Sequence, residues 1–185
     1  MKIKNLIFII LAGLFAALTA IGAFIKIPLP YLPLTLQVFF CLLAGILLGP
    51  KWGAASQLVY IAIGLTGIPV FTNGGGPGYI FQPSFGYLLG LIACASVIGL
   101  ITQRLKKITV TRLFLINLLG VLVIYAIGLP YLYIIFNAYM GKPTTLAKVL
   151  SIGFITTVPG DILKSYLAAL IGAKLLPAVK KLIHL

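Results

Sequence analysis

The sequence contains almost no acidic side chains. Its 185 residues include one aspartate, Asp161, no glutamate and one histidine, His184. One carboxylate excludes mechanisms that need a carboxylate pair, and the lack of clustered histidine, cysteine and carboxylate residues excludes an ordinary metal site. No G-x-x-x-x-G-K-[ST] loop is present, so the chain does not bind ATP in that way. We therefore expect no enzyme activity, no metal and no bound cofactor.

Charged residues of either sign are also scarce. They form 8% of the chain, whereas hydrophobic residues form 62%, and a soluble domain of this length has too little interior to cover so much apolar surface. A membrane-spanning helix needs about 20 apolar residues, so the chain has room for about six spans. We expect an all-α integral membrane protein with a single six-helix domain over residues 1–185. The expected spans lie near residues 5–25, 33–50, 53–71, 80–103, 113–136 and 149–173. The two cysteines, Cys41 and Cys94, fall within these spans without a C-x-x-C spacing and favour simple packing.

The basic residues give a net charge of +13. They occur singly or in small clusters between apolar blocks and form no basic helical face, so nucleic acid is not an expected partner. With the N-terminus inside, the expected spans place on the inner side Lys2, Lys4, Lys51, Arg104, Lys106, Lys107, Arg112, Lys174, Lys180 and Lys181. The outer loops carry Lys26, Lys142 and Lys148. This positive-inside bias predicts that both termini are cytoplasmic.

Proline and glycine mark the expected breaks between spans. Three prolines in "KIPLPYLPLTLQ" (26–37) prevent a regular helix, and "GPKWG" (49–53) predicts a tight inner turn that makes the second and third spans a hairpin. The Gly-rich core of residues 72–78 cannot be a lipid-facing helix, because hydrocarbon offers no partners for its backbone. This segment is either a flexible outer loop or the rim of a site where backbone approaches a ligand closely.

Asp161 lies near the middle of the last expected span, where a charge costs at least ~2.5–3.5 kcal/mol on insertion scales. Lys164 follows at a spacing of i,i+3, so both side chains project from one helix face, which we expect to point into the bundle. Two interpretations remain open. The pair either fastens the helices, although apolar packing often stabilises as much as a buried ion pair, or it binds a ligand. Ser165 beside Lys164 does not suggest a hydrolase, because adjacent helical residues point about 100° apart.

Pro159 and Gly160 directly precede Asp161. Proline cannot donate to the helix ladder and glycine loosens it, so we expect the span to kink or restart there, with Asp161 near a new N-terminus that favours a carboxylate. Discontinuous helices at mid-depth form the substrate sites of many transporters. The predicted ligand is small, with a polar N–H end and an acidic end.

Small residues recur at every fourth position of the first span, at Ala12, Ala16 and Ala20. This spacing permits close helix contact in membranes. The contact is either packing inside the bundle or an outward surface for a partner membrane subunit.

Several segments together resemble the BioY family, the biotin-specific substrate-binding (S) components of energy-coupling-factor transporters. The similar segments, in the family's order, are "AGLFAALTAIGAFI" (12–25), "PLTLQVFFCLLAGILLGPKWGA" (33–54), "GLTGIPVFTNGGGPG" (64–78), "QPSFGYLLG" (82–90) and "PGDILKSYLAA" (159–169). The resemblance implies a prokaryotic multi-pass protein of the cell membrane with the six-helix S-component fold and cytoplasmic termini. It also implies high-affinity capture of extracellular biotin, with ATP hydrolysed by two cytoplasmic ATPase subunits that act through a membrane coupling (T) subunit.

The resemblance also assigns roles to residues. The family's acid and lysine fall on Asp161 and Lys164, which implies that Asp161 accepts the ureido N–H groups of biotin and Lys164 binds its carboxylate. The resemblance also implies contacts at Asn73, Gln82 and Tyr87, and the family's docking stripe falls on the three alanines of the first span. We expect the apolar rings of biotin to pack on aromatic side chains such as Tyr79 or Tyr166. Two other functions stay open: an S component or small transporter for another vitamin, and a structural membrane protein in which the Asp161–Lys164 pair is a fastener.

Overall fold

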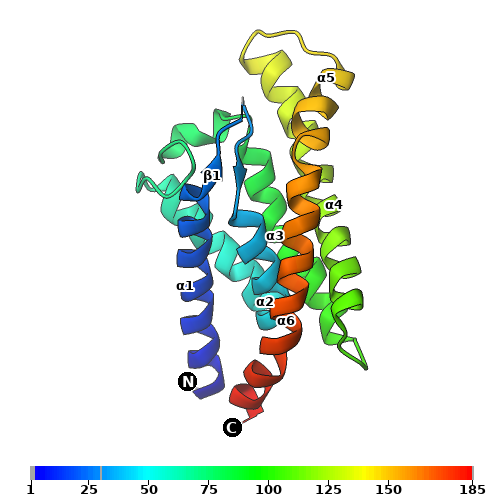
Figure 1. Ribbon diagram of the computed structural model, residues 1–185. Coiled ribbons are helices and arrows are strands. Elements are labelled where there is room, and N and C mark those ends of the chain that lie inside the picture. Colours follow the sequence, from blue (N-terminus) through cyan, green and yellow to red (C-terminus); the bar gives the residue numbers. More distant parts are fainter. Residues whose placement is uncertain (1–2, 30, 185) are drawn as a thin grey trace.

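The protein is almost entirely helical in a computed structural model that describes residues 3–29 and 31–184 (Figure 1). In chain order the elements are α1 (Ile3–Phe24), β1 (Lys26–Ile27), β2 (Leu34–Thr35), α2 (Gln37–Leu65), the 3₁₀-helix η1 (Pro77–Phe81), α3 (Phe85–Gln103), α4 (Val110–Ile134), the π-helix η2 (Ile135–Tyr139), α5 (Leu146–Leu150), the π-helix η3 (Ser151–Ile155) and α6 (Val158–His184). Within the described residues, five helical stretches are long and apolar enough to cross a membrane: Lys4–Phe24, Gln37–Leu65, Phe85–Gln103, Val110–Tyr139 and Leu146–Lys181.

Helix α2 reverses direction at Gly49, whose backbone is not helical (φ 77°, ψ −175°). The two arms then pack against each other, because a Cβ added at Gly53 would lie 3.0 Å from the Ala44 carbonyl oxygen. In a straight helix these two residues would be about 13 Å apart along the axis. The positive φ and Pro50 explain the break, because glycine adopts this conformation readily and proline is suited to the start of a new helix. The predicted hairpin turn at residues 49–53 is confirmed.

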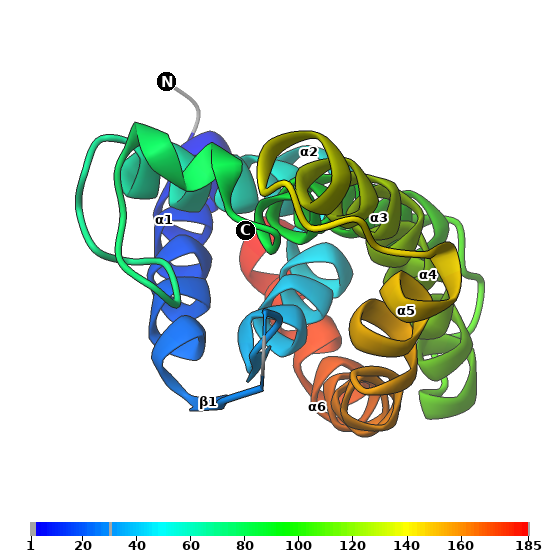
Figure 2. The same cartoon turned by 90° about the horizontal axis from the view of Figure 1, so that it is seen from above.

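The first arm of α2 is the centre of the bundle. Residues 41–49 are all buried, and a view from above shows this arm surrounded by α1, α3, α4 and α6 (Figure 2). Its sequence, "QVFFCLLAGILL", is apolar on all sides, which is typical of a helix enclosed by other helices. The outer helices instead expose apolar side chains such as Ile10, Leu122 and Leu163, at 62%, 54% and 59%, as expected for surfaces that face lipid.

The expected span boundaries need correction at several points. Residues 26–29 and 31–36 are not helical, so the second span begins later than residue 33. Within them a short antiparallel ribbon pairs Lys26 with Thr35 and Ile27 with Leu34. Residues 66–71 lie outside α2, and residues 80–84 belong to η1 and a turn, because the Gly- and Pro-rich segment extends further in both directions than hydropathy suggests. The last helix continues well past residue 173.

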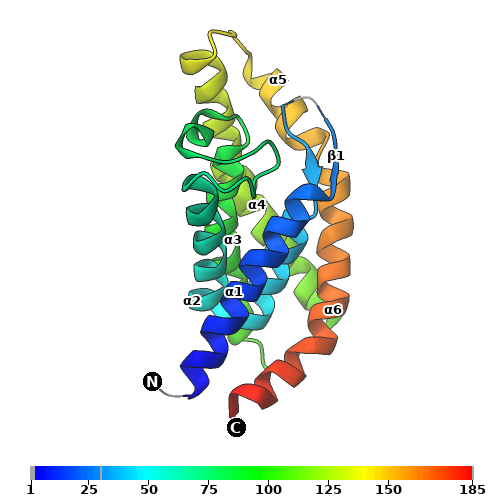
Figure 3. The same cartoon turned by 90° about the vertical axis from the view of Figure 1, so that its left-hand side faces the viewer.

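The two ends of the molecule differ in what they carry. The start of α1 and the end of α6 lie at one end, together with the α2 bend and the α3–α4 connection (Figure 3). The β-ribbon, the Gly-rich loop and α5 lie at the opposite end. Most lysine and arginine side chains therefore gather at the end with the termini, and the loop end carries Lys26, Lys142 and Lys148.

Candidate ligand-binding pocket

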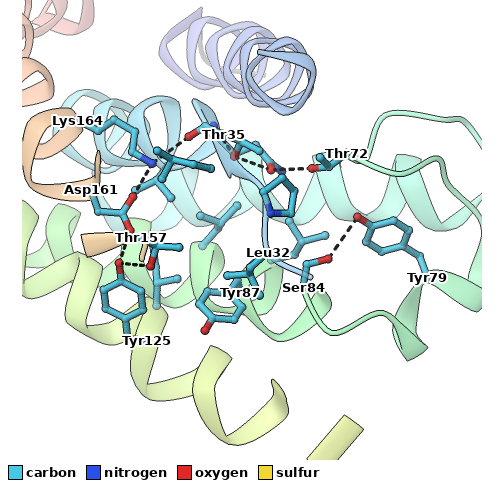
Figure 4. Close-up of a pocket in the computed structure, with 17 residues that line it drawn as sticks. Leu32, Thr35, Thr72, Tyr79, Ser84, Tyr87, Tyr125, Thr157, Asp161 and Lys164 are labelled. Carbon is cyan, nitrogen blue, oxygen red and sulfur yellow. Dashed lines mark hydrogen bonds and ion pairs between the residues drawn. The ribbon is translucent and has the colours of Figure 1, made fainter. Parts of the chain in front are cut away.

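A pocket opens at the loop end of the bundle, between the β-ribbon, α2, α3, α4 and α6. Its space measures about 590 Å³ with the open mouth included. Most of the wall surface is apolar, although ten of the seventeen lining residues carry a polar group (Figure 4). The lining residues are Leu32, Pro33, Leu34, Thr35, Gln37, Val38, Thr72, Tyr79, Ser84, Tyr87, Leu88, Leu91, Ile124, Tyr125, Thr157, Asp161 and Lys164.

Asp161 reaches this pocket from the first turn of α6. The π-helix η3 ends at Ile155, a two-residue turn follows, and α6 begins at Val158 with Pro159 in its first turn, where the missing N–H of proline costs nothing. The backbone N–H of Asp161 donates to the Thr157 carbonyl oxygen at 3.1 Å. The expected restart of the helix just before Asp161 is confirmed.

Asp161 and Lys164 form an ion pair inside the bundle. The Lys164 Nζ lies 2.5 Å from Asp161 Oδ1, and the two residues are only 6% and 5% exposed. Lys164 also donates to the Thr35 carbonyl oxygen at 3.0 Å. The Tyr125 hydroxyl donates to Asp161 Oδ2 and lies 3.0 Å from Thr157 Oγ1. The charges therefore contact α4 and the β-ribbon as well as each other, and both side chains border the pocket (Figure 4).

A second polar group forms the wall nearer the Gly-rich loop. The Gln37 Oε1 accepts hydrogen bonds from Thr35 Oγ1 at 2.9 Å and Thr72 Oγ1 at 3.3 Å. Its Nε2 donates to the Tyr60 hydroxyl at 2.7 Å, which in turn donates to the Val70 carbonyl oxygen at 3.2 Å. This network ties the start of α2 to the loop that follows the same helix, and it fixes the orientation of the Thr72 hydroxyl.

Tyr79 and Ser84 place two hydroxyls 3.4 Å apart at the mouth. Burial is the main cause that raises the pKa of the Tyr79 phenol above its usual value. Tyr79 is therefore a neutral donor at physiological pH, suited to hydrogen bonding with an acceptor that enters from the loop end.

Some of the sequence-predicted contacts meet in this pocket and others do not. Asp161, Lys164, Tyr79 and Tyr87 line it, and the Tyr87 hydroxyl donates to the Gly153 carbonyl oxygen at 3.1 Å.

Asn73, Gln82 and Tyr166 are exposed and lie outside the pocket lining, so the structure does not support the contacts predicted for them. Asn73 lies in the tight turn closed by the Phe71–Gly74 bridge, and Gln82 is the residue that ends η1. Tyr166 follows Lys164 by two positions, which turns its side chain about 200° around α6, and it packs on Phe114.

Sequence patterns assign no role to Gln37, Thr72 and Thr157, although all three are polar residues of the wall. An aromatic belt explains most of the group Tyr125, Tyr131, Tyr133 and Tyr139, with room for one or two of them to line a pocket, and Tyr125 lines this one. Gln37 carried a detectable signal, because a glutamine at the entry to an otherwise apolar, fully buried helix needs a polar partner.

The alanine stripe on α1 faces the bundle. Ala12 and Ala16 are 5% and 3% exposed and Ala20 is half-buried, with Ala16 and Ala20 in contact with the apolar core. The structure supports the packing interpretation. A docking role for the stripe stays a prediction, and it would require these side chains to be uncovered.

Comparisons with known proteins agree on one group. The model of the BioY family matches residues 1–181. The probable biotin transporter BioY of Lysinibacillus sphaericus is 43% identical over 175 residues, covering 95% of this chain and 89% of that protein. The biotin transporter BioY of Thermotoga maritima is 39% identical over 168 residues, or 90% and 94% of the two chains. The 2.1 Å crystal structure of the S-component for biotin from an ECF-type ABC transporter superposes with a TM-score of 0.81 and 27% identity, over 95% of this chain and 93% of that one.

Proposed function

The chain belongs to the BioY family, and we propose that it is the biotin-binding S component of an energy-coupling-factor uptake transporter in the cell membrane. The relatives with 43% and 39% identity are biotin transporters, and the matching solved structure is a biotin S-component. The observation that carries the proposal is the pocket at the loop end, which has a mostly apolar wall surface and is bordered by the Asp161–Lys164 pair.

Biotin matches this pocket in polarity. Its fused rings suit an apolar wall, and its ureido group offers two N–H donors and a carbonyl acceptor. An aspartate oxygen accepts from an N–H and a lysine ammonium donates to a carbonyl oxygen, so we place the ureido group against both Asp161 and Lys164.

This placement revises the prediction that Lys164 holds the carboxylate of biotin. Asp161 and Lys164 lie 2.5 Å apart, whereas the rings and the valerate chain hold the two ends of an extended biotin much further apart. The carboxylate then points toward the mouth, where Thr72, Tyr79 and Ser84 carry hydroxyls. Lys26, whose Nζ donates to the Thr72 carbonyl oxygen at 2.6 Å, adds a cation next to this rim.

We also propose six membrane crossings with both termini in the cytoplasm. The reversal at Gly49 supports counting the two arms of α2 as separate crossings, so that the five apolar stretches become six. The concentration of basic side chains at the end with the termini supports a cytoplasmic location for that end. The pocket then opens to the outside.

We propose that other subunits supply the energy for uptake. The sequence has no Walker-type phosphate loop, and the matching solved structure comes from an ECF-type ABC transporter. We therefore assign ATP hydrolysis to two cytoplasmic ATPases, and transmission of its energy to a membrane coupling subunit.

Calorimetry on the purified protein tests the proposal with three ligands: biotin, biotin methyl ester and an unrelated vitamin such as riboflavin. We expect biotin to bind and riboflavin not to bind. Asp161→Asn and Lys164→Ala should each weaken biotin at least tenfold while the proteins elute from size-exclusion columns like the parent. Absence of biotin binding by the parent protein would refute the function.

Biotin methyl ester lacks the carboxylate charge, so its binding shows which end of biotin Lys164 contacts. If Lys164 contacts the ureido group, Lys164→Ala weakens biotin and its methyl ester by the same factor. A loss confined to biotin would instead place the carboxylate at Lys164.

Binding of another vitamin in place of biotin would favour the alternative of a different S component. If the double variant with apolar residues in place of Asp161 and Lys164 binds every ligand as the parent does, the pair is only a structural fastener between helices.

A further inference from the structure

A second cavity lies at the end of the bundle that carries the termini, far from the biotin pocket. It measures about 960 Å³ with its open side included. Four elements enclose it: the start of α1, the bend of α2, the last turn of α3 and the last turns of α6. Its lining residues are Lys4, Phe8, Ile46, Leu47, Leu48, Gly49, Pro50, Lys51, Trp52, Thr102, Gln103, Leu176 and Lys180.

The charged side chains that line this cavity are all basic. Lys4, Lys51 and Lys180 come from three different helices, and all three are exposed. The chain's one acidic side chain, Asp161, lines the other pocket, so no carboxylate side chain neutralises these lysines from within the protein. Three lysines on one cavity with no acidic side chain beside them favour an anionic ligand.

A buried hydroxyl also points to a ligand. Thr102 lines the cavity and is 3% exposed, and its Oγ1 has no hydrogen-bond partner among the described residues. A threonine in a helix usually bonds its hydroxyl to a carbonyl of the preceding turn, as Thr19 does here at 2.8 Å. An orphaned buried hydroxyl is uncommon. The Oγ1 itself is fully buried, so a phosphate oxygen in the cavity would accept from it once the side chain turns toward the cavity.

The rest of the wall is mostly apolar, with Gln103 as its other polar side chain. Ile46, Leu47 and Leu176 are buried in it. Trp52 stacks on Phe8 with ring centroids 5.8 Å apart and an angle of 3° between the rings, and the Lys51 Nζ lies 5.7 Å from the Trp52 ring. Tryptophan favours the level of the lipid headgroups, and a wall that is basic at its rim and apolar inside matches a molecule with an anionic head and hydrocarbon chains.

We propose that this cavity binds an anionic glycerophospholipid, with its phosphate among Lys4, Lys51 and Lys180 and accepting a hydrogen bond from Thr102. The glycerol and the upper acyl chains then pack on the apolar wall beside Trp52. The proposal does not depend on biotin binding, because the two pockets share no residue.

Native mass spectrometry of the detergent-purified protein, titrated with phosphatidylglycerol or with phosphatidylcholine, tests this site. We expect one phosphatidylglycerol to be retained at concentrations where phosphatidylcholine is not. The triple variant Lys4→Gln, Lys51→Gln, Lys180→Gln should lower the affinity for phosphatidylglycerol at least tenfold. A matched control, Lys106→Gln, Lys107→Gln, Lys174→Gln, removes the same charge from three exposed lysines outside the lining and should change binding less than twofold.

Two substitutions test the role of the Thr102 hydroxyl. Thr102→Val removes the donor at nearly constant shape and should lower the affinity for phosphatidylglycerol several-fold, whereas Thr102→Ser should retain binding. Equal losses in both triple variants, or no loss in either, would overturn the site. If inorganic phosphate at millimolar concentration displaces the lipid completely, the cavity takes a free anion and the lipid assignment is wrong. Thermal unfolding of each variant confirms that it is folded.

Discussion

Asp161 is a buried carboxylate that is stabilised by partners from several parts of the fold. The carboxylate lies 5% exposed in a bundle that contains no other acidic side chain, and such a group is retained only where hydrogen bonds and a counter-charge replace water. Lys164 supplies the charge, Tyr125 supplies a hydroxyl from α4, and the restart of α6 places Asp161 in a first turn, where the helix dipole favours a negative group. The same contacts hold the carboxylate at the pocket wall, where a ligand meets it.

Tyr125→Phe tests this arrangement at the level of one atom. A hydrogen bond to a charged group is worth about 1.5–3 kcal/mol, so loss of the Tyr125 hydroxyl should weaken biotin binding about tenfold or more by calorimetry, because Asp161 is no longer held in place. Tyr133→Phe is the control, since Tyr133 lies on the same helix, is 41% exposed and is not part of the pocket lining. Equal affinities for the parent and Tyr125→Phe would contradict the positioning role of the hydroxyl.

At the scale of elements, the bend of α2 determines how the pocket is built. The first arm runs through the centre of the bundle with residues 41–49 buried, and the second arm returns against it. The return brings Tyr60 and the loop with Thr72 beside Gln37, which lies at the start of the same helix. Without the reversal at Gly49, the Gly-rich loop and the start of α2 would lie at opposite ends of one long helix.

Gly49→Ala should destabilise the protein. A side chain at φ 77° and ψ −175° costs about 1–3 kcal/mol, and the added Cβ would lie 2.3 Å from the Gln103 amide nitrogen. We expect a clear drop in the thermal unfolding midpoint in detergent.

Two variants separate the causes of this effect. Gly13→Ala in α1 meets no atom within 4 Å and should leave the midpoint unchanged or raise it, because alanine favours helix by about 0.5–1 kcal/mol. Adding Gln103→Ala to Gly49→Ala should restore only the part of the loss caused by crowding. A Gly49→Ala protein as stable as its parent would show that the positive φ is not required.

At the scale of the whole molecule, the two ends have separate tasks. The loop end carries the proposed biotin pocket, and the end with the termini carries most of the basic side chains and the proposed lipid cavity. This asymmetry fits a protein whose binding site faces outward while its basic end lies among anionic headgroups.

Cysteine labelling in intact cells tests this orientation. Lys142→Cys should react with a membrane-impermeant maleimide, and Lys107→Cys should react only after the cells are permeabilised, because the two residues lie on opposite sides of the proposed bilayer. The parent is a suitable background, since Cys41 and Cys94 are both fully buried. Labelling of Lys107→Cys in intact cells would invert the proposed topology.

Composition and local motifs are enough to predict the class of the protein and the breaks in its helices. An apolar fraction of 62% with one acidic residue leaves the bilayer as the solvent for most of the surface. Pro159-Gly160, the turn at residues 49–53 and the prolines of residues 26–37 act on their own backbone, so the restart of α6, the reversal of α2 and the non-helical ribbon were all predictable. The i,i+3 spacing of Asp161 and Lys164 likewise fixed their common face.

The tertiary structure decided which distant residues meet. Gln37, Thr72 and Tyr125 come from three segments, and their convergence depends on how the helices rotate and pack, which no local pattern specifies. For the same reason the sequence placed Asn73, Gln82 and Tyr166 at a site that they do not reach, and left open which way the alanine stripe of α1 faces. Helical spacing tells which residues share a face, and only packing against the other helices tells where that face points.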